Sequence, residues 1–313
     1  MTMYHAPVML NEILQFMNPQ DNEIYVDCTF GAGGYSNALL NVKNCRVYAI
    51  DRDPYVVKIA NELAAKTNNR LVFIGGRFSE IEQLLLSKNI YKVNGIVLDL
   101  GVSSMQLDQS ERGFSFMKNA HLDMRMSQEG VDAYEVVNNM GEEQLANIIF
   151  NYGEERHSRR IARKIVKTRQ NKPIATTLEL ADIIHSAIGA RQGKIDSATR
   201  TFQAIRIYIN DELNELHGVL ESAEKLLIDG GRLVVVSFHS LEDSIVKAFF
   251  RARSGKINNS RSRYMPEQND VNSAIKTFSI LTKQAVKPTI EEVSNNPRAR
   301  SARLRAAKRL NIL

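Results

Sequence analysis

The sequence predicts an α/β fold: a parallel sheet of Rossmann type with an all-helical insertion. Short apolar runs alternate with helical patterns over the first hundred residues, which is typical of parallel strands joined by crossover helices. The alternation stops after Asp99 and returns with an apolar run at 232–238. We therefore expect residues 1–108 and 211–313 to form the sheet domain, the second part with a basic C-terminal tail. Residues 109–210 are expected to form the inserted helical domain.

The first predicted strand leads into a glycine-rich turn. An apolar run at 24–26 ends at Asp27, and three glycines follow closely: Gly31, Gly33 and Gly34. Glycine lets the backbone turn tightly and approach a ligand that a Cβ atom would exclude. The turn is therefore a candidate ligand-binding loop.

The second predicted strand, 46–50, is followed by Asp51. An acid roughly 20 residues beyond a glycine turn is where a βαβ unit hydrogen-bonds the ribose of an adenosine cofactor. A dinucleotide site has a third glycine where this chain has Ser36. The Gly33-Gly34 pair and the strand-end acid Asp27 instead suit S-adenosylmethionine, whose ammonium a carboxylate can bind. A glycine turn without a ligand and a nicotinamide-dependent dehydrogenase are the alternatives.

The next elements continue the alternation. Asp53 is expected to cap a helix that begins at Pro54 and runs to about residue 66. A third strand follows at 71–74, and the S-x-x-E pattern from Ser79 to Glu82 predicts a capping box for the next helix.

A fourth strand, 95–98, is followed by Asp99. Ligands of open α/β sheets bind beyond the carboxyl ends of the strands. We therefore expect Asp27, Asp51, Phe78 and Asp99 to converge on one edge of the sheet.

Helical patterns replace strands after Asp99. They cover 142–150, 156–169 and 176–188, and a long amphipathic segment covers 198–228. The third of these helices begins with a capping box, and the stop signal Asp229-Gly230-Gly231 follows the long segment. The polar stretch 254–274 is expected to be a mobile loop.

Composition limits the class of protein. The chain has 313 residues, of which 43% are hydrophobic, and no run approaches the ~20 apolar residues of a membrane span. The cysteines, Cys28 and Cys45, lack metal-ligand spacing and predict reduced core thiols in a cytoplasmic protein, without a metal site. The net charge of +6 agrees with a polyanionic partner.

The positive charge is concentrated in two clusters. The first lies within the helix predicted at 156–169 and its exit, and it includes Arg156, Arg159, Arg160, Arg163 and Lys164. The second lies near the C-terminus and includes Arg298, Arg300 and Arg303. A solvated helix face is the alternative for either cluster alone. Both together, in a chain with a cofactor fold, favour contacts to nucleic-acid phosphates.

Sequence motifs in a fixed order resemble the MraW (RsmH) family along nearly the whole chain. They include DCTFGAGGYS, DLGVSSMQLDQSERGFSF, LDMRM and NPRARSARLR. The resemblance implies a class I methyltransferase with a Rossmann-like sheet and an inserted helical domain. It also implies S-adenosylmethionine-dependent methylation of the exocyclic N4 amine of one cytidine of small-subunit (16S) ribosomal RNA near the decoding centre. The expected substrate is RNA in an assembled or nearly assembled subunit, and a homodimer remains open. The alternative is a non-catalytic RNA-binding assembly factor that keeps a cofactor pocket.

The resemblance also implies cofactor contacts. By motif these fall on Gly33, Gly34, Tyr35, Asp51, Phe78, Asp99 and Gln106. Asp51 would accept from the ribose hydroxyls, and Phe78 would pack against the adenine. Tyr35 departs from the family pattern, which usually has histidine there. Further departures are His121 and the pair Asp196-Ser197.

Two residues are candidates for the catalytic proton acceptor. Asp99 follows the fourth strand, where the methyl donor and the target amine are expected to meet. His239 follows the fifth strand, and its alternative is a structural cap for the helix that begins at 240. Because a base inside a duplex cannot reach a buried methyl group, a flipped or single-stranded cytidine is expected. Phe114 and Phe116 are candidates to stack on it.

Overall fold

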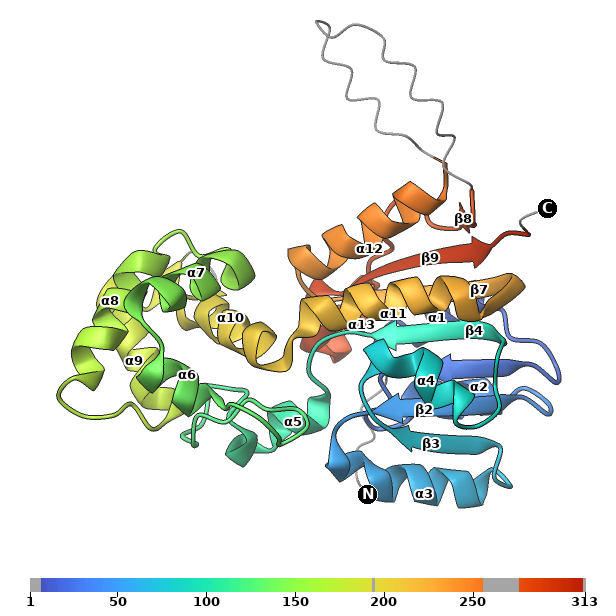
Figure 1. Ribbon diagram of the computed structural model, residues 1–313, viewed down its shortest axis with the longest axis horizontal. Coiled ribbons are helices and arrows are strands. Elements are labelled where there is room, and N and C mark those ends of the chain that lie inside the picture. Colours follow the sequence, from blue (N-terminus) through green and yellow to red (C-terminus); the bar gives the residue numbers. More distant parts are fainter. Residues whose placement is uncertain (1–6, 193–194, 256–275, 312–313) are drawn as a thin grey trace, which may run out of the picture. The chain divides into compact units, whose positions relative to one another are not determined.

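The computed structural model describes residues 7–192, 195–255 and 276–311, which divide into two compact units. One unit comprises Met1–Gly101 and Asn214–Leu313, and the other comprises Val102–Leu213 (Figure 1). Most of the loop predicted at 254–274 lies outside the described residues. Among those residues, no helix is both long and apolar enough to cross a membrane.

The first unit is built on a seven-stranded sheet. Its strands are β1 (Ile24–Asp27), β2 (Arg46–Asp51), β3 (Leu71–Gly75), β4 (Val93–Asp99), β7 (Leu227–Ser237), β8 (Phe278–Ile280) and β9 (Arg303–Arg309). They lie in the order β3-β2-β1-β4-β7-β9-β8. The first five of these are parallel, whereas β9 runs antiparallel to both of its neighbours. The predicted α/β fold of Rossmann type is confirmed.

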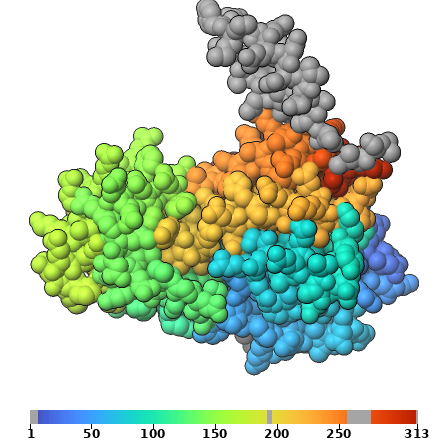
Figure 2. Space-filling view, viewed as in Figure 1, coloured from blue at the N-terminus to red at the C-terminus, as the bar shows by residue number. Residues whose placement is uncertain are grey.

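Helices cover both faces of this sheet. On one face lie α4 (Ile81–Leu86), α11 (Glu212–Leu226) and α12 (Ser240–Arg253), whose apolar side chains share one buried core with the strands. The outer surfaces of α4 and α11 are visible in the space-filling view (Figure 2). Helices α1 (Leu10–Met17), α2 (Gly34–Leu40) and α3 (Val57–Lys66) pack against the strands on the other face. Strands buried on both faces read as continuous apolar runs, as β4 does. A further helix, α13 (Ile290–Asn295), precedes the last strand.

Two predicted helix starts have different outcomes. Asp53 caps the turn η1 (Pro54–Val56), which leads into α3, and accepts from the Tyr55 amide at 3.0 Å as predicted. The capping box predicted from Ser79 is wrong. Residues Phe78–Glu80 form the 3-10 turn η2, and α4 begins only after it. The Ser79 amide donates to the Glu215 carboxylate of α11 instead, because that helix packs directly on the turn.

The long amphipathic segment predicted at 198–228 is two helices. Asp211 adopts a left-handed conformation (φ 52°) that ends α10 (Ala198–Asn210) before α11 begins. Aspartate is one of the few residue types that tolerate this conformation. The break therefore needs no glycine or proline, and the hydrophobic periodicity did not reveal it.

The glycine pair after α11 marks a bulge rather than a helix end. Strand β7 begins at Leu227, which pairs with Val93, whereas Arg232 pairs with Gly95. The extra residues between these pairs loop out around Gly230, whose φ of 83° suits glycine. Strand β7 therefore begins five residues before the predicted start of 232.

The predicted basic C-terminal tail is wrong, because most of its residues form β9 inside the sheet. Leu304 and Ala306 are buried on the strand, and Arg305 donates to the Asp243 carboxylate of α12 at 2.6 and 3.0 Å. Arg303 reaches the same carboxylate at 3.3 Å. Alternating small apolar residues and arginines thus encode an internal strand, with a charge clamp to α12.

The second unit is helical. It contains α5 (Ser104–Asp108), η3 (Ser110–Arg112), α6 (Ala133–Asn139), α7 (Glu142–Gly153), α8 (Ser158–Arg169), α9 (Thr177–Ile188) and α10 around one apolar core. The predicted capping box of α9 is confirmed, since Thr176 accepts from the Glu179 amide at 3.3 Å. The short strands β5 (Arg191–Gln192) and β6 (Ile195–Asp196) were not predicted. The unit begins before residue 109 because Val102 and Leu107 already pack against its core.

The clamp between α12 and β9 generates a stability prediction. Asp243→Asn leaves the nearly buried Arg305 guanidinium without its charge partner, so we expect the free energy of unfolding to fall by roughly 3–5 kcal/mol. Urea denaturation measures the change. Glu142→Gln is the matched control, because its partner Arg163 is exposed and such pairs contribute at most about 1 kcal/mol.

The pH dependence of the same pair follows from its titration. Burial alone would raise the pKa of Asp243, but hydrogen bonds and charge from Arg305, with a smaller effect from Arg303, lower it overall. A lowered pKa in the folded state contributes stability above the unfolded pKa, and this is lost as the pH falls through the folded value. The gap between wild type and Asp243→Asn should therefore close in acid. An equal gap at neutral and acid pH contradicts the ionic origin.

Candidate functional site

The carboxyl edge of the sheet gathers the acids that end three strands. Asp27, Asp51 and Asp99 are the last residues of β1, β2 and β4, which are parallel neighbours. Asp27 lies near enough to each of the other two for their charges to affect one another. The predicted convergence of these acids on one edge is therefore what the structure shows.

Asp51 is held by the glycine turn. Its Oδ2 accepts from the Gly31 amide at 2.8 Å, and its Oδ1 accepts from the Asp53 amide at 2.9 Å. Burial raises the pKa of Asp51, although these two hydrogen bonds oppose the shift. Each carboxylate oxygen can accept a further bond, so the side chain is oriented and can still receive ribose hydroxyls.

The glycines of the turn are required by neighbours within the chain. Gly33 has φ 79°, and a Cβ atom there would lie 2.8 Å from the Phe30 ring. A Cβ on Gly34 would lie 2.2 Å from the Cγ of Pro7, which packs directly over the turn. Both positions therefore exclude larger residues, and the close approach brings the N-terminal segment to the site.

Asp27 is fully buried, and Ser36 is its partner. The Ser36 hydroxyl donates to Asp27 Oδ2 at 2.7 Å, and the Thr29 amide donates to Oδ1 at 3.2 Å. Burial raises the pKa of Asp27 to about 6, against the lowering effect of the Ser36 hydrogen bond. Ser36 was not predicted as a site residue. Its position where a dinucleotide fold has glycine was the available signal, because a side chain there reaches the carboxylate at the end of β1.

Asp99 carries the most perturbed carboxyl of the edge. Its amide donates to the Thr29 hydroxyl at 2.7 Å, whereas its carboxyl oxygen Oδ1 is buried without a partner among the described residues. Burial raises the pKa of Asp99 to about 8. A hydrogen bond with Tyr35 lowers it, and the charges of Asp27 and Glu242 raise it further. A buried carboxyl with an unpartnered oxygen fits a cationic ligand, because either a cation or a donor would relieve its desolvation.

Phe78 and Gln106 lie in different compact units. Phe78 opens η2 at the end of β3 and is half-buried, with part of its ring against the core. Gln106 belongs to α5 of the second unit, where its side-chain oxygen accepts from the Ser103 amide at 3.0 Å. Gln106 is thus the capping-box partner of Ser103. Both remain predictions as cofactor contacts.

His239 caps the start of α12, which was the structural alternative to a catalytic role. Its Nδ1 accepts from the Glu242 amide at 3.5 Å, and its Nε2 lies 3.1 Å from a Glu242 carboxylate oxygen. Glu242 also accepts from the Phe238 amide at 2.8 Å. The imidazole therefore caps α12 through Nδ1, whereas Nε2 is buried beside the Glu242 carboxylate without a hydrogen-bond partner among the described residues.

The basic residues around α8 are exposed. Ile161, Ala162 and Ile165 face the core, and the predicted phosphate-binding residues Arg156, Arg159, Arg160, Arg163 and Lys164 all face solvent. Arg169 differs, because its guanidinium donates to the backbone carbonyls of Val137 and Met140. The helix thus has one apolar stripe and a wide cationic surface.

The C-terminal arginines are separated by the direction of β9. Because β9 is antiparallel to β7, Arg303 pairs with Ser237 at the carboxyl edge, whereas Lys308 pairs with Arg232 near the opposite edge. Arg298 and Arg300 are exposed in the turn η4 (Pro297–Ser301) just before β9. The three arginines predicted to bind RNA therefore lie at the edge that carries the acids.

The aromatic residues predicted to stack on a base are part of the second unit's core. Phe114 is buried beneath the Arg112 guanidinium, 5.6 Å from its ring centroid. Phe116 packs edge-to-face on Phe202 with centroids 5.0 Å apart. These contacts account for both rings, so the prediction that they receive a flipped base is not supported.

The residues that depart from the family pattern have local roles. Asp196 accepts from the Ala198 amide at 2.8 Å and lies 2.8 Å from the His185 imidazole of α9. The Ser197 hydroxyl donates to the Gly189 carbonyl. His121 stacks at a tilt on Tyr134. Asp196 and Ser197 therefore join the end of α9 to the start of α10.

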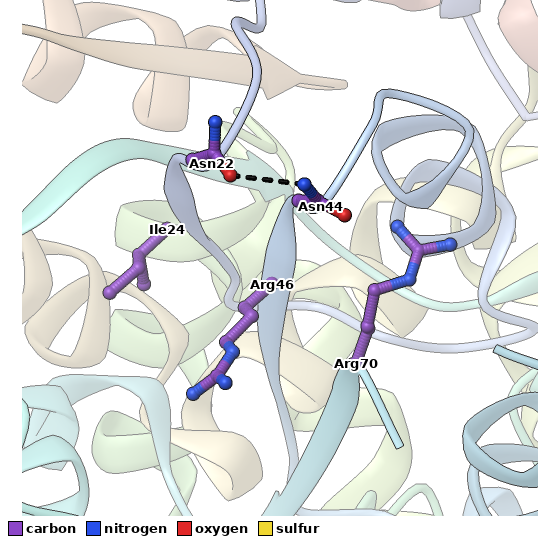
Figure 3. A pocket seen from close by; sticks show the side chains of 5 residues that line it. All are labelled: Asn22, Ile24, Asn44, Arg46 and Arg70. Carbon is purple, nitrogen blue, oxygen red and sulfur yellow. Dashed lines mark hydrogen bonds between the residues drawn. The ribbon is translucent and has the colours of Figure 1, made fainter. Parts of the chain in front are cut away.

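A separate pocket of about 420 Å³ opens at the amino edge of the sheet, away from the acids. Its lining residues are Asn22, Ile24, Asn44, Arg46 and Arg70 (Figure 3). The two guanidinium groups point away from one another, and Arg70 donates to the Val42 and Cys45 carbonyls. Because the two arginines do not converge on one ligand, the carboxyl edge remains the better candidate for the functional site. Cys45 nearby and Cys28 are buried free thiols, as predicted.

Comparison with known proteins gives a full-length family match. The model of the MraW methylase family matches residues 2–310. Two proteins named ribosomal RNA small subunit methyltransferase H are similar over almost their whole lengths. The one from Wolbachia sp. subsp. Drosophila simulans is 50% identical over 99% of this chain and 100% of its own. The one from Rickettsia bellii is 54% identical over 98% and 99%. A solved rRNA methylase from Streptococcus thermophilus has a TM-score of 0.41 at 9% identity, over 96% of this chain and 94% of that one, which is too remote to inform the site.

The raised pKa of Asp99 generates a prediction for the ligand-free protein. A carboxyl whose folded pKa lies above its unfolded value loses stability as the pH rises between the two, here from about 4 to about 8. Asp99→Asn cannot ionise and escapes this loss. We therefore expect the melting temperature of the variant, relative to wild type, to rise between pH 5 and pH 8.5.

Thermal melts without ligand at the two pH values measure that difference. The pH 5 comparison is the internal control, because wild-type Asp99 is then neutral and nearly isosteric with asparagine. A constant difference between variant and wild type would show that Asp99 titrates normally.

Proposed function

Because the chain belongs to the MraW methylase family, we propose that it methylates small-subunit (16S) ribosomal RNA at the exocyclic N4 amine of one cytidine near the decoding centre. Family membership confirms the predicted S-adenosylmethionine-dependent methyltransferase. The observation that carries the substrate is the full-length similarity to relatives named for ribosomal RNA of the small subunit. The cytidine and its N4 position come from the motif resemblance.

The carboxyl edge supplies groups that fit the methyl donor. S-adenosylmethionine brings an electrophilic methyl group on a sulfonium, together with an ammonium and a ribose. Asp51 is oriented to receive ribose hydroxyls, and the glycine turn beside it permits close approach. Asp27 and Asp99 provide the negative charge that a sulfonium and an ammonium require, at an edge where Asp27 and one Asp99 oxygen are buried.

Asp99 is the stronger candidate for the proton acceptor. In the ligand-free protein its carboxyl is mostly neutral at pH 7, because burial raises its pKa to about 8. A cation held nearby lowers that pKa and makes the carboxylate available as an acceptor for the target amine. His239 is less suited, because its Nδ1 accepts from the Glu242 amide and so caps α12. Since displacement at a sulfonium needs alignment more than covalent help, one acceptor is enough.

The RNA contacts that we propose are electrostatic. Arg298, Arg300 and Arg303 lie at the same edge as the acids, and the exposed residues of α8 offer a second cationic surface. Phosphate contacts hold a nucleic acid in place without reading its sequence. We infer that the helical insertion binds RNA in an assembled or nearly assembled small subunit, in the cytoplasm where ribosomes work.

Methyl transfer to defined substrates tests the proposal. Labelled S-adenosylmethionine is incubated with the protein and with small ribosomal subunits that lack the modification, and nucleosides are analysed by mass spectrometry. We expect label in N4-methylated cytidine. Naked ribosomal RNA is the parallel substrate, and stronger transfer to subunits would support recognition of the assembled particle.

Two other outcomes would change the conclusion. Label in another nucleoside keeps the methyltransferase and removes the cytidine-N4 specificity. Cofactor binding without transfer to either substrate favours the alternative of a non-catalytic assembly factor.

Neutralising the α8 surface should weaken RNA binding and its salt dependence. The triple variant Arg159→Gln, Arg160→Gln, Arg163→Gln removes three exposed charges. Each phosphate contact contributes roughly 0.7–0.9 to the slope of log affinity against log salt, so we expect the loss of three contacts to flatten the slope by roughly 2–3. Binding to a small-subunit RNA fragment at several salt concentrations measures it.

The matched control removes the same charge elsewhere. Lys58, Lys66 and Lys88 are exposed residues of the first unit on or next to α3 and α4, and changing all three to Gln lowers the net charge equally. An equal slope change in both triple variants would mean that only net charge matters. An unchanged slope in the α8 variant would exclude this helix from the interface.

A further inference from the structure

The hydroxyl of Tyr35 lies between two oxygen groups from different segments. Tyr35 is the second residue of α2, and its side chain is only 4% exposed. Its hydroxyl donates to the Val8 carbonyl at 2.6 Å, and it lies close enough to the Asp99 carboxyl for each group to shift the pKa of the other. A phenol carries one proton, so it cannot donate to both at once.

The Val8 carbonyl is a fixed acceptor. The next residue, Met9, is fully buried, and its amide donates to a Glu292 carboxylate oxygen of α13 at 2.6 Å. Pro7 packs against the glycine turn on the other side. With its proton directed to Val8, the Tyr35 oxygen can only accept from Asp99, which must then be protonated.

The surroundings of Asp99 favour that neutral form while no cation is present. The charged groups that face it are acidic, Asp27 at the end of β1 and Glu242 on α12, and Tyr35 faces it from α2. A cation at this edge reverses the balance, because it stabilises the carboxylate. The ionised side chain then needs a donor, and Tyr35 is in place to be one.

We propose that Tyr35 is a positioning residue for Asp99: its hydroxyl donates to Val8 in the ligand-free protein and turns to donate to the Asp99 carboxylate when S-adenosylmethionine is bound. The inference rests on the proposed function, since it takes this cofactor as the cation. Asp99 releases one proton to solvent, and the O–H bond of Tyr35 stays intact. Val8 is partly exposed, and its carbonyl then accepts from water.

Tyrosine and histidine share the property that this exchange needs. An imidazole can donate from one nitrogen and accept at the other, so it can serve Val8 and Asp99 alternately. This accounts for tyrosine at a position where the motif resemblance expects histidine. Phenylalanine fills the same space without the hydroxyl and isolates its contribution.

Calorimetric titration of S-adenosylmethionine, without RNA, tests the exchange. At pH 6.5 we expect the wild type to release close to one proton per cofactor bound, measured in buffers of different ionisation enthalpy. Tyr35→Phe should bind about tenfold more weakly at pH 6.5, because the bound carboxylate loses a charge-assisted hydrogen bond. At pH 9 the ratio should approach one, since Asp99 is then ionised both before and after binding. Any change in the cofactor's own ionisation affects both proteins equally, so it cancels in this ratio.

Two further variants separate positioning from general packing. Tyr48→Phe is the matched control: Tyr48 is buried on β2, and its hydroxyl makes no hydrogen bond with the residues that the structure describes. It should leave the ratio near one at both pH values. Tyr35→His should restore most of the affinity at pH 7.5, and it keeps the test available if Tyr35→Phe folds poorly.

Different outcomes overturn different statements. Weakening by Tyr35→Phe to the same extent at pH 6.5 and pH 9 overturns the positioning role, because a purely structural defect does not depend on the charge of Asp99. Wild-type binding without proton release at pH 6.5 also overturns it and leaves the cofactor assignment intact. Failure of the wild type to bind the cofactor at either pH overturns the proposed function together with this inference.

Discussion

The desolvation of acids at one edge of a parallel sheet is the constraint that organises the first unit. Asp27, Asp51 and Asp99 are brought together because their strands are parallel neighbours that end within two residues of one another at the same edge. Each is then oriented by the chain around it, through Ser36, the Gly31 amide and Tyr35 respectively. Asp27 is fully buried and Asp51 and Asp99 are partly buried before any ligand is present, so the acids carry an unfavourable energy in the free protein. A cationic ligand can use that energy, because it relieves the repulsion on arrival.

The same topology determines where positive charge lies. A strand that joins a parallel sheet in the opposite direction carries its first residues to the edge where the others end. In β9 this places Arg303 beside the acids and sends Lys308 towards the far edge, although the two are near neighbours in sequence. Charge that reads as one cluster along the chain is therefore divided between two edges. Acids and arginines at one edge provide opposite charges for a cationic cofactor and an anionic nucleic acid.

The sequence predicted the parts of this arrangement that depend on local pattern. Apolar runs ending in acid located β1, β2 and β4, and the glycine turn located the ligand loop, because these signals need only a few adjacent residues. The predictions that failed depend on long-range packing. The arginines of β9 read as a tail because their partner, Asp243, lies far away in sequence, and Ser79 lost its capping role to Glu215 of α11. The contact of Val8 with Tyr35 has no sequence signature, since a backbone carbonyl accepts whatever residue carries it.

Strand β9 also bears on how the protein is made. It follows every other described element in the chain, yet it lies between β7 and β8 and supplies the pairing partner through which β8 joins the sheet. Until the ribosome has synthesised β9, one edge of β7 has no pairing strand. Asp243 also lacks its ion-pair partners Arg303 and Arg305 during that time. Nascent chains of this protein therefore expose an unpaired, apolar strand edge, which can pair with another chain. Protection of that edge during synthesis, by a chaperone or by rapid completion of translation, is a requirement that the strand order itself creates.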